Sequence, residues 1–276
     1  MTGIKNTSIF ILFFVISILP QGQLTIFPAE LNIKPFIANF LEPKVGVMFM
    51  SGKNNLRLDI GNSKDFLHYA CDENIFSLGG DFYTYTKLRG EKDFHFPVDA
   101  VDYLFGLNGG MKIRNANSEY GMRARLSHIS AHFVDGHFDG FSNAWRNGRT
   151  PRVYSREFIE VTPYYSTNDF RFYVGYDYLF HVVPKEIGRS IFQIGGEKFF
   201  NVTFTDYLFP FIAYDLRLTQ IGKYSGTNSL SAGVKVGNKN SSGISFMIDY
   251  FSGNTIHGEY FDYKEKYVAF RMNMDL

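Results

Sequence analysis

The segment YVAFRMNMDL, residues 267–276, alternates between two kinds of side chain. Its even-numbered positions hold Val, Phe, Met, Met and Leu, whereas the odd-numbered positions from 269 onward hold Ala, Arg, Asn and Asp. Successive side chains of a β-strand point to opposite faces of the sheet. A period of two therefore predicts a strand here, with one apolar face and one largely polar face.

Similar alternation recurs along most of the chain. In one example, apolar Phe170, Phe172 and Val174 alternate with Arg171 and Tyr173. We count about twelve such segments, at residues 44–50, 55–61, 76–87, 100–109, 120–134, 153–166, 169–182, 190–199, 203–219, 229–237, 243–252 and 266–276. Single-chain bacterial membrane barrels have an even number of strands. The pattern predicts an all-β fold, a transmembrane antiparallel β-barrel of about 12 strands.

Composition favours this barrel over the alternative, in which the last segment is an edge strand of a soluble sandwich. Aromatic residues make up 18% of the chain, and apolar stretches are interrupted by a charge or a glycine every few residues. Aromatic girdles and a polar interior are typical of membrane barrels. The net charge of +1 disfavours nucleic acid as a partner, and the single cysteine excludes an intrachain disulfide.

The last segment also ends on an apolar residue, Leu276. A terminal strand with this alternation and this ending resembles the assembly signal of bacterial outer-membrane barrels. The resemblance implies an outer-membrane location. It also implies two kinds of partner, which are outer-membrane lipids and the barrel-assembly machinery.

The first residues have the pattern of an export signal. Lys5 precedes an apolar run of eleven residues, Ile9–Leu19. A spanning helix needs about 20 apolar residues, whereas a run of this length is typical of a signal-peptide core. We therefore predict a signal peptide at residues 1–22 and the barrel at residues 44–276. Residues 23–43 contain three prolines, too many for a strand, and are expected to form a periplasmic N-terminal segment or a lumen plug.

Connection lengths predict the orientation of the barrel. Connections that leave odd-numbered strands after the first hairpin are long, at 88–99, 135–152, 183–189, 220–228 and 253–265. Those that leave even-numbered strands are mostly short, as at 166–168 and 238–242. Short turns are periplasmic and long loops extracellular in such barrels, so both termini are predicted to be periplasmic. The exception is 62–75, expected to be a longer periplasmic turn that contains Cys71.

A candidate catalytic group lies on the segment 122–134. Its polar face carries Arg123 and Arg125, whereas its apolar face continues into His128 and Ser130, which would face lipid. Residues i and i+2 of a strand lie about 6.6 Å apart. The imidazole of His128 could therefore bridge much of the distance to the Ser130 hydroxyl and activate it as a nucleophile.

The next predicted strand offers an acidic partner for this histidine. Glu157 is two residues before Ile159, so both side chains point to the lipid-facing side of the strand. If Val134 pairs with Pro151 across the loop, Glu157 lies directly opposite His128. The predicted site is Ser130 as nucleophile, His128 as base and Glu157 as the orienting carboxylate.

This constellation resembles that of two enzyme families. A His-x-Ser on a lipid-facing strand, with Asn or Glu on the following strand, is similar to bacterial outer-membrane phospholipase A and lipid A deacylase. The match covers His128, Ser130 and Glu157. Phospholipase-type barrels place an asparagine after the serine, whereas this chain has Ala131 and His132.

A broader resemblance covers most of the chain beyond the predicted signal. Four segments look like those of an uncharacterised bacterial outer-membrane family known only as a domain of unknown function. They are IANFLEPK at 37–44, LRLDIGN at 56–62, FHFPV at 94–98 and LSHISAHFVDG at 126–136. This resemblance supports the location and implies no particular activity.

Two classes of function remain open. The first, which the sequence favours, is a non-enzymatic outer-membrane barrel, either an envelope-structure protein or a narrow or occluded pore. His128 and Ser130 would then be interfacial or structural. The inward charges, predicted to form a lumen network, are Arg123, Arg125, Arg156, Glu160, Arg171 and Asp177.

The alternative is an outer-leaflet lipid hydrolase that uses the His-Ser pair. No cofactor is evident from the sequence. Ca²⁺ is expected only under this alternative, with Asp135 and Asp139 as candidate ligands.

Overall fold

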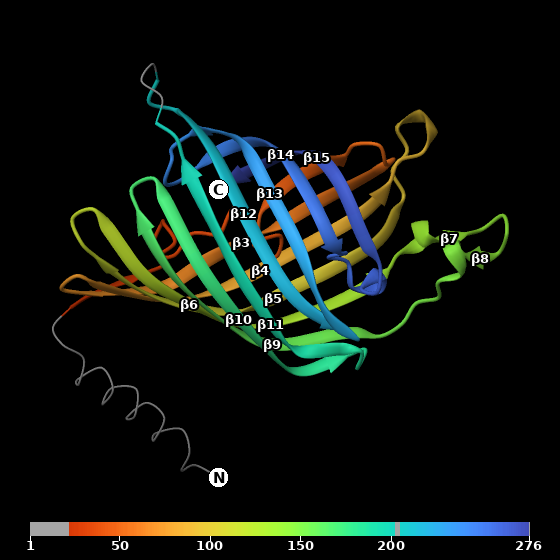
Figure 1. The fold of residues 1–276 in the computed structure, drawn as a ribbon, viewed down its shortest axis with the longest axis horizontal. Helices are drawn as coiled ribbons and strands as arrows, with labels where there is room; N and C mark the ends of the chain where they lie inside the picture. Colours follow the sequence, from red (N-terminus) through yellow and green to blue (C-terminus); the bar gives the residue numbers. More distant parts are fainter. Residues whose placement is uncertain (1–21, 202–204, 276) are drawn as a thin grey trace, which may run out of the picture.

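The computed structural model describes residues 22–201 and 205–275, and these residues form a closed antiparallel barrel (Figure 1). Its sheet has thirteen strands, of which twelve make the barrel wall and one, β1 (Gln23–Ile26), is added at the seam. The wall strands are β2 (Val45–Met50), β3 (Asn55–Cys71), β4 (Asn74–Arg89), β5 (Val98–Arg114), β6 (Ser118–Phe133), β9 (Tyr154–Thr167), β10 (Phe170–Val183), β11 (Ile187–Phe199), β12 (Leu208–Ile221), β13 (Lys223–Gly237), β14 (Gly243–Asn254) and β15 (Lys264–Asp275). The barrel closes because β3 pairs with both β2 and β4. The predicted all-β barrel of about 12 strands is confirmed.

The wall is apolar outside and polar inside, the reverse of a soluble protein. On β10, Phe172, Val174 and Tyr176 are each about two-fifths exposed, whereas Tyr173 and Asp177, on the opposite face of the strand, are buried. An outer surface of this kind requires a lipid environment. No helix within residues 22–201 and 205–275 is long and apolar enough to cross a membrane.

Three connections are shorter than the sequence predicts. Residues 62–71 belong to β3 and continue its ladder with β4 through a bulge between Asp65 and Leu67, so only residues 72–73 turn. The loop predicted at 220–228 is a turn at Gly222, and the one at 183–189 shortens to residues 184–186. These strands extend beyond the apolar alternation because their backbone hydrogen bonds continue where the outward face no longer has to be apolar.

The N-terminal segment begins as a strand and then enters the lumen. Contrary to the expectation that its prolines would exclude a strand, residues 23–26 precede the first proline and pair with Leu67–Ala70 of β3. β2 pairs with the other half of the same strand. Between these two pairings, Asn39 and Glu42 are almost completely buried inside the barrel. Residues 32–44 therefore occupy the lumen, attached at both ends to β3.

The opposite end of the lumen is covered by the loop after β14. Residues 255–261, including η4 (Gly258–Tyr260), are buried. The Asp102 carboxylate, inward on β5, contacts the His257 ring at 2.8 Å and accepts a hydrogen bond from the Gly258 amide at 2.7 Å. The lumen is thus filled from both ends.

The longest loop, between β6 and β9, projects from the barrel as a small hairpin (Figure 1). It contains β7 (Phe138–Asp139) and β8 (Ala144–Trp145), with short 3₁₀ turns η2 (Asp135–His137) and η3 (Arg146–Gly148). A further turn, η1 (Lys92–Phe94), lies in the loop between β4 and β5. The longest loops at this end of the barrel are residues 90–97, 134–153 and 255–263. We call it the loop-rich end.

Candidate functional site

The structure brings the predicted pair of His128 and Glu157 together on the outward face. β6 and β9 pair so that His128 lies opposite Glu157 and Ser130 lies opposite Ser155. Leu126 and Ile159, on the same faces, are nearly half exposed, so these side chains point away from the lumen. The register predicted from the sequence is confirmed.

The histidine is held by the carboxylate and an aromatic ring. Nδ1 of His128 lies 2.6 Å from Oε1 of Glu157, and the ring packs against Phe105 of β5 at 4.9 Å between centroids. An ionised carboxylate only accepts hydrogen bonds, so Nδ1 carries the proton. In the neutral ring Nε2 is then the nitrogen with a lone pair, which is the arrangement that a general base needs.

Two residues that the sequence analysis missed also bind Glu157. The Ser155 hydroxyl donates to Oε1 at 2.8 Å, and Nδ1 of His181 on β10 contacts Oε2. Ser155 could have been found from its parity, since it is two residues from Glu157 on the same strand. His181 could not, because a bulge between Leu179 and His181 shifts the register of β10. The carboxylate is therefore fixed by three side chains from three strands.

Ser130 is half-buried on the same face, paired in register with Tyr103 of β5 and Ser155 of β9. Its hydroxyl makes no hydrogen bond within the described residues, to His128 or to any other group. Contacts between a nucleophile and its base are often long without substrate and shorten in the reacting complex. The wall thus presents an oriented imidazole two residues from a hydroxyl, without a direct bond between them.

The two predicted calcium ligands lie in the projecting loop, away from this group. Asp135 accepts a hydrogen bond from the Gly136 amide at 2.9 Å, and Asp139 accepts one from the Phe141 amide at 3.1 Å. In the part of the chain that the structure describes, no three His, Cys, Asp or Glu side chains form a group that could hold a metal ion. Calcium binding by Asp135 and Asp139 stays a prediction.

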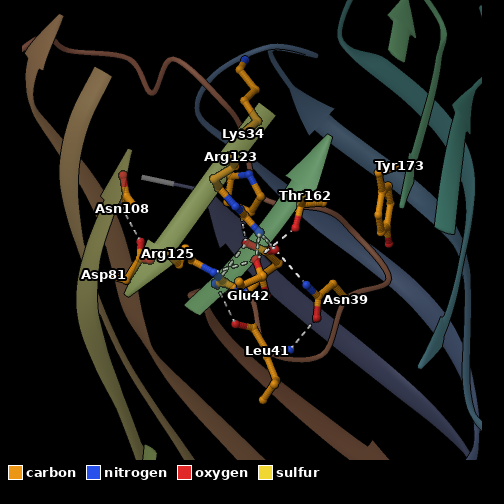
Figure 2. A network of polar contacts seen from close by, with 12 residues as sticks. Lys34, Asn39, Leu41, Glu42, Asp81, Asn108, Arg123, Arg125, Thr162 and Tyr173 are labelled. Carbon is orange, nitrogen blue, oxygen red and sulfur yellow. Dashed lines mark hydrogen bonds and ion pairs between the residues drawn. The ribbon is translucent and has the colours of Figure 1, made fainter. Parts of the chain in front are cut away.

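Inside the barrel, the predicted charged network centres on Glu160. The carboxylate accepts two hydrogen bonds from Arg125, at 2.9 and 2.6 Å, and further ones from Arg123 at 3.2 Å and Arg217 at 3.3 Å. Arg123 also binds Glu42 of the lumen segment at 2.8 Å (Figure 2). The plug and the wall are thus joined by buried ion pairs.

The other predicted members of the network differ in their partners. Asp177 joins it through Arg217, at 3.0 Å. Arg171 pairs instead with Glu197, at 2.5 Å. Arg156 makes no ion pair within the described residues and lies over the Tyr154 ring.

One family model matches this chain, over residues 97–276, and its description is "Protein of unknown function (DUF1207)". The chain belongs to this family. No curated protein matches the sequence. The matched residues of this DUF1207 protein include both β6 and β9, which carry the candidate site.

Solved structures with a similar fold are outer-membrane barrels. Outer membrane phospholipase A from Escherichia coli is 12% identical, with a TM-score of 0.55 over 90% of this chain and 95% of that chain. The beta domain of the Bordetella autotransporter BrkA is 9% identical, with a TM-score of 0.44 over 84% of this chain and 96% of that chain. At 12% identity, the likeness to the phospholipase supports the fold of the DUF1207 protein and no activity.

Proposed function

We propose that this protein is an outer-membrane barrel that hydrolyses lipid esters on its outward wall. The observation that carries the proposal is the contact between Nδ1 of His128 and Oε1 of Glu157, with Ser130 two residues along the same strand. Polar groups that face lipid are unfavourable, so a group held by three hydrogen-bonding partners calls for a function.

The proposed chemistry is acyl transfer to water. The Ser130 hydroxyl attacks the ester carbonyl while Nε2 of His128 takes its proton. The same proton passes to the leaving alcohol, which departs as a lysolipid or a deacylated lipid. Water activated by His128 then cleaves the acyl-serine ester, which releases a fatty acid and restores Ser130. Glu157 stabilises the imidazolium in both steps.

The location of the group suits an ester at the outer leaflet. His128 and Ser130 lie toward the loop-rich end of β6. We take the long loops as extracellular and both termini as periplasmic, as connection length implies for this class of barrel. The group then faces the outer half of the membrane, near the boundary between headgroups and acyl chains.

The test is activity together with covalent labelling. Purified protein in mixed micelles should release fatty acid from phospholipid or from ester-linked acyl chains of lipopolysaccharide, measured with and without Ca²⁺. A fluorophosphonate probe should label the peptide that contains Ser130. Ser190→Ala is the matched control, since Ser190 is another outward hydroxyl, bound to Tyr176 at 3.1 Å. Absence of both hydrolysis and labelling in every condition would contradict the proposal.

A second candidate is a non-enzymatic envelope barrel with an occluded lumen. The observation that favours it is the filling of the lumen by residues 32–44 at one end and 255–261 at the other. Under this candidate the His128 group anchors the barrel at the membrane interface.

The filled lumen predicts little or no ion conductance in planar bilayers, whichever candidate holds. Replacing residues 28–43 by a short Gly-Ser linker, together with removal of residues 255–261, should produce openings, because the lumen then loses its filling at both ends, including Glu42 and its bonds to Arg123. Single-channel recording measures both proteins under the same voltage. Large stable openings of the unaltered protein would show that the plug does not block the lumen.

A further inference from the structure

The barrel has a cavity of about 840 Å³ at the end opposite the His128 group. Its lining includes residues 29–32 and 34–37 of the N-terminal segment and, in the turns after β5, β9 and β13, residues 115–117, 168–169 and 239–241. We call this cavity the basal vestibule. Its volume is within the range of about 300–1,000 Å³ that is usual for small-molecule sites.

Lys34 is held so that its side chain is free to meet a ligand. Arg171 donates hydrogen bonds to the carbonyls of Lys34 and Pro35, at 2.8 and 2.6 Å, which fixes the backbone. The Lys34 side chain extends away from the network around Glu42 (Figure 2). Its ammonium makes no hydrogen bond or ion pair within the described residues, although it lines the vestibule.

Other cations surround the same space. Burial lowers the pKa of the Lys34 ammonium to about 8, with Glu30 opposing the shift and nearby positive charges adding to it. The cations that add to it are Lys112, Arg171 and Lys235. Positive charge is therefore concentrated around Lys34.

These three cations already have acceptors. Lys112 donates to the Asn32 carbonyl at 2.6 Å, Lys235 pairs with Asp275 at 2.6 Å, and Arg171 pairs with Glu197. Lys34 makes no ion pair within 4 Å in the described residues, and Glu30 is the acidic side chain that acts on it. Among these four cations, Lys34 is the one without a bonded acceptor in the described residues.

We propose that the basal vestibule binds a small multivalent anion, of the phosphate-bearing class, with Lys34 as a direct ligand. An anion with more than one negative charge is attracted both by the Lys34 ammonium and by the electric field of the neighbouring cations, and both attractions strengthen its binding. The phosphate could be free or part of a lipid headgroup, because both present the same oxygens. The inference does not depend on the proposed hydrolase.

Calorimetry on the full-length protein in detergent tests the site, with inorganic pyrophosphate as one probe and bis(glycerophospho)glycerol, the doubly charged deacylated headgroup of cardiolipin, as the other. Lys34→Gln should weaken binding about tenfold or more, the usual effect of losing a hydrogen bond to a charged group. Lys223→Gln, at the exposed first residue of β13, should bind as the unaltered protein does. The probe that binds more tightly identifies the source of the phosphate. No binding of either probe, or equal binding by the Lys34 variant, would overturn the proposal.

A second measurement needs no variant and so does not depend on folding of the Lys34→Gln protein. In the unaltered protein, the bound probe should slow acylation of Lys34 by an amine-reactive reagent, followed by mass spectrometry, and should leave acylation of Lys223 unchanged. Equal rates at Lys34 with and without the probe would exclude Lys34 as a ligand.

Discussion

Ser130→Ala is expected to abolish the release of fatty acid while the barrel remains folded. The hydroxyl makes no hydrogen bond within the described part of the chain and faces outward, so its loss should scarcely change assembly. Without it, no acyl-serine ester forms, and only background hydrolysis remains. Fatty-acid release from mixed micelles measures the activity, and a heat-dependent shift on gels reports folding. A folded Ser130→Ala protein with unreduced activity would exclude Ser130 as the nucleophile.

His128→Ala is expected to be similarly inactive, with a loss of about a thousandfold or more in kcat, because an unassisted serine hydroxyl is a weak nucleophile near neutral pH. Ser190→Ala, the matched outward serine, should retain full activity. If His128→Ala and Ser190→Ala lost activity equally, the effect would be one of general disturbance to the wall.

Glu157→Gln is expected to lose less than either change. The amide oxygen of the new side chain still accepts the hydrogen bond from Nδ1 of His128, so the ring keeps its orientation and tautomer. What is lost is the negative charge that stabilises the imidazolium. In catalytic triads the orienting member can contribute less than the other two. A loss larger than that of His128→Ala would point to a structural role of Glu157 through Ser155 and His181.

The sequence was sufficient for the wall strands and for the central contact of the site. A membrane barrel requires apolar outward positions wherever the wall meets lipid, so parity alone places Glu157 and His128 on the same face. One assumed pairing across the loop then determined their register, and the structure has that register. The prediction succeeded because a slip of one residue would have turned every apolar side chain inward.

The sequence was insufficient where the lipid constraint ends. In β3 the outward positions after Ile60 hold Asn62 and Lys64, so the alternation disappears although the ladder with β4 continues. In β13 the outward Gly226 and Asn228 have the same effect. The contact of His181 depends on a bulge, which has no signature in the local sequence.

Glu160→Ala is expected to give the largest loss of stability in the barrel. Glu160 is 1% exposed, and its carboxylate is shared by the guanidinium groups of Arg123, Arg125 and Arg217. Its removal leaves these three buried cations close together, with Arg125 losing its nearest counter-ion. Loss of one partner from a buried ion pair typically costs about 3–5 kcal/mol in the free energy of unfolding, because the remaining charge is uncompensated.

Denaturant unfolding of the barrel refolded into lipid vesicles measures this loss. The matched control is Asp169→Ala, which removes a carboxylate from a more exposed pair with Lys239 and should cost no more than about 1 kcal/mol. A double variant, Glu160→Leu with Arg125→Met, should be more stable than Glu160→Ala, because it removes one of the unpaired cations along with the carboxylate. If Glu160→Ala and Asp169→Ala lost the same small amount, the lumen would have to be wet enough to screen its charges. The barrel would then be held together by its wall strands, and the ion pairs to Glu42 would serve only to keep the plug in place.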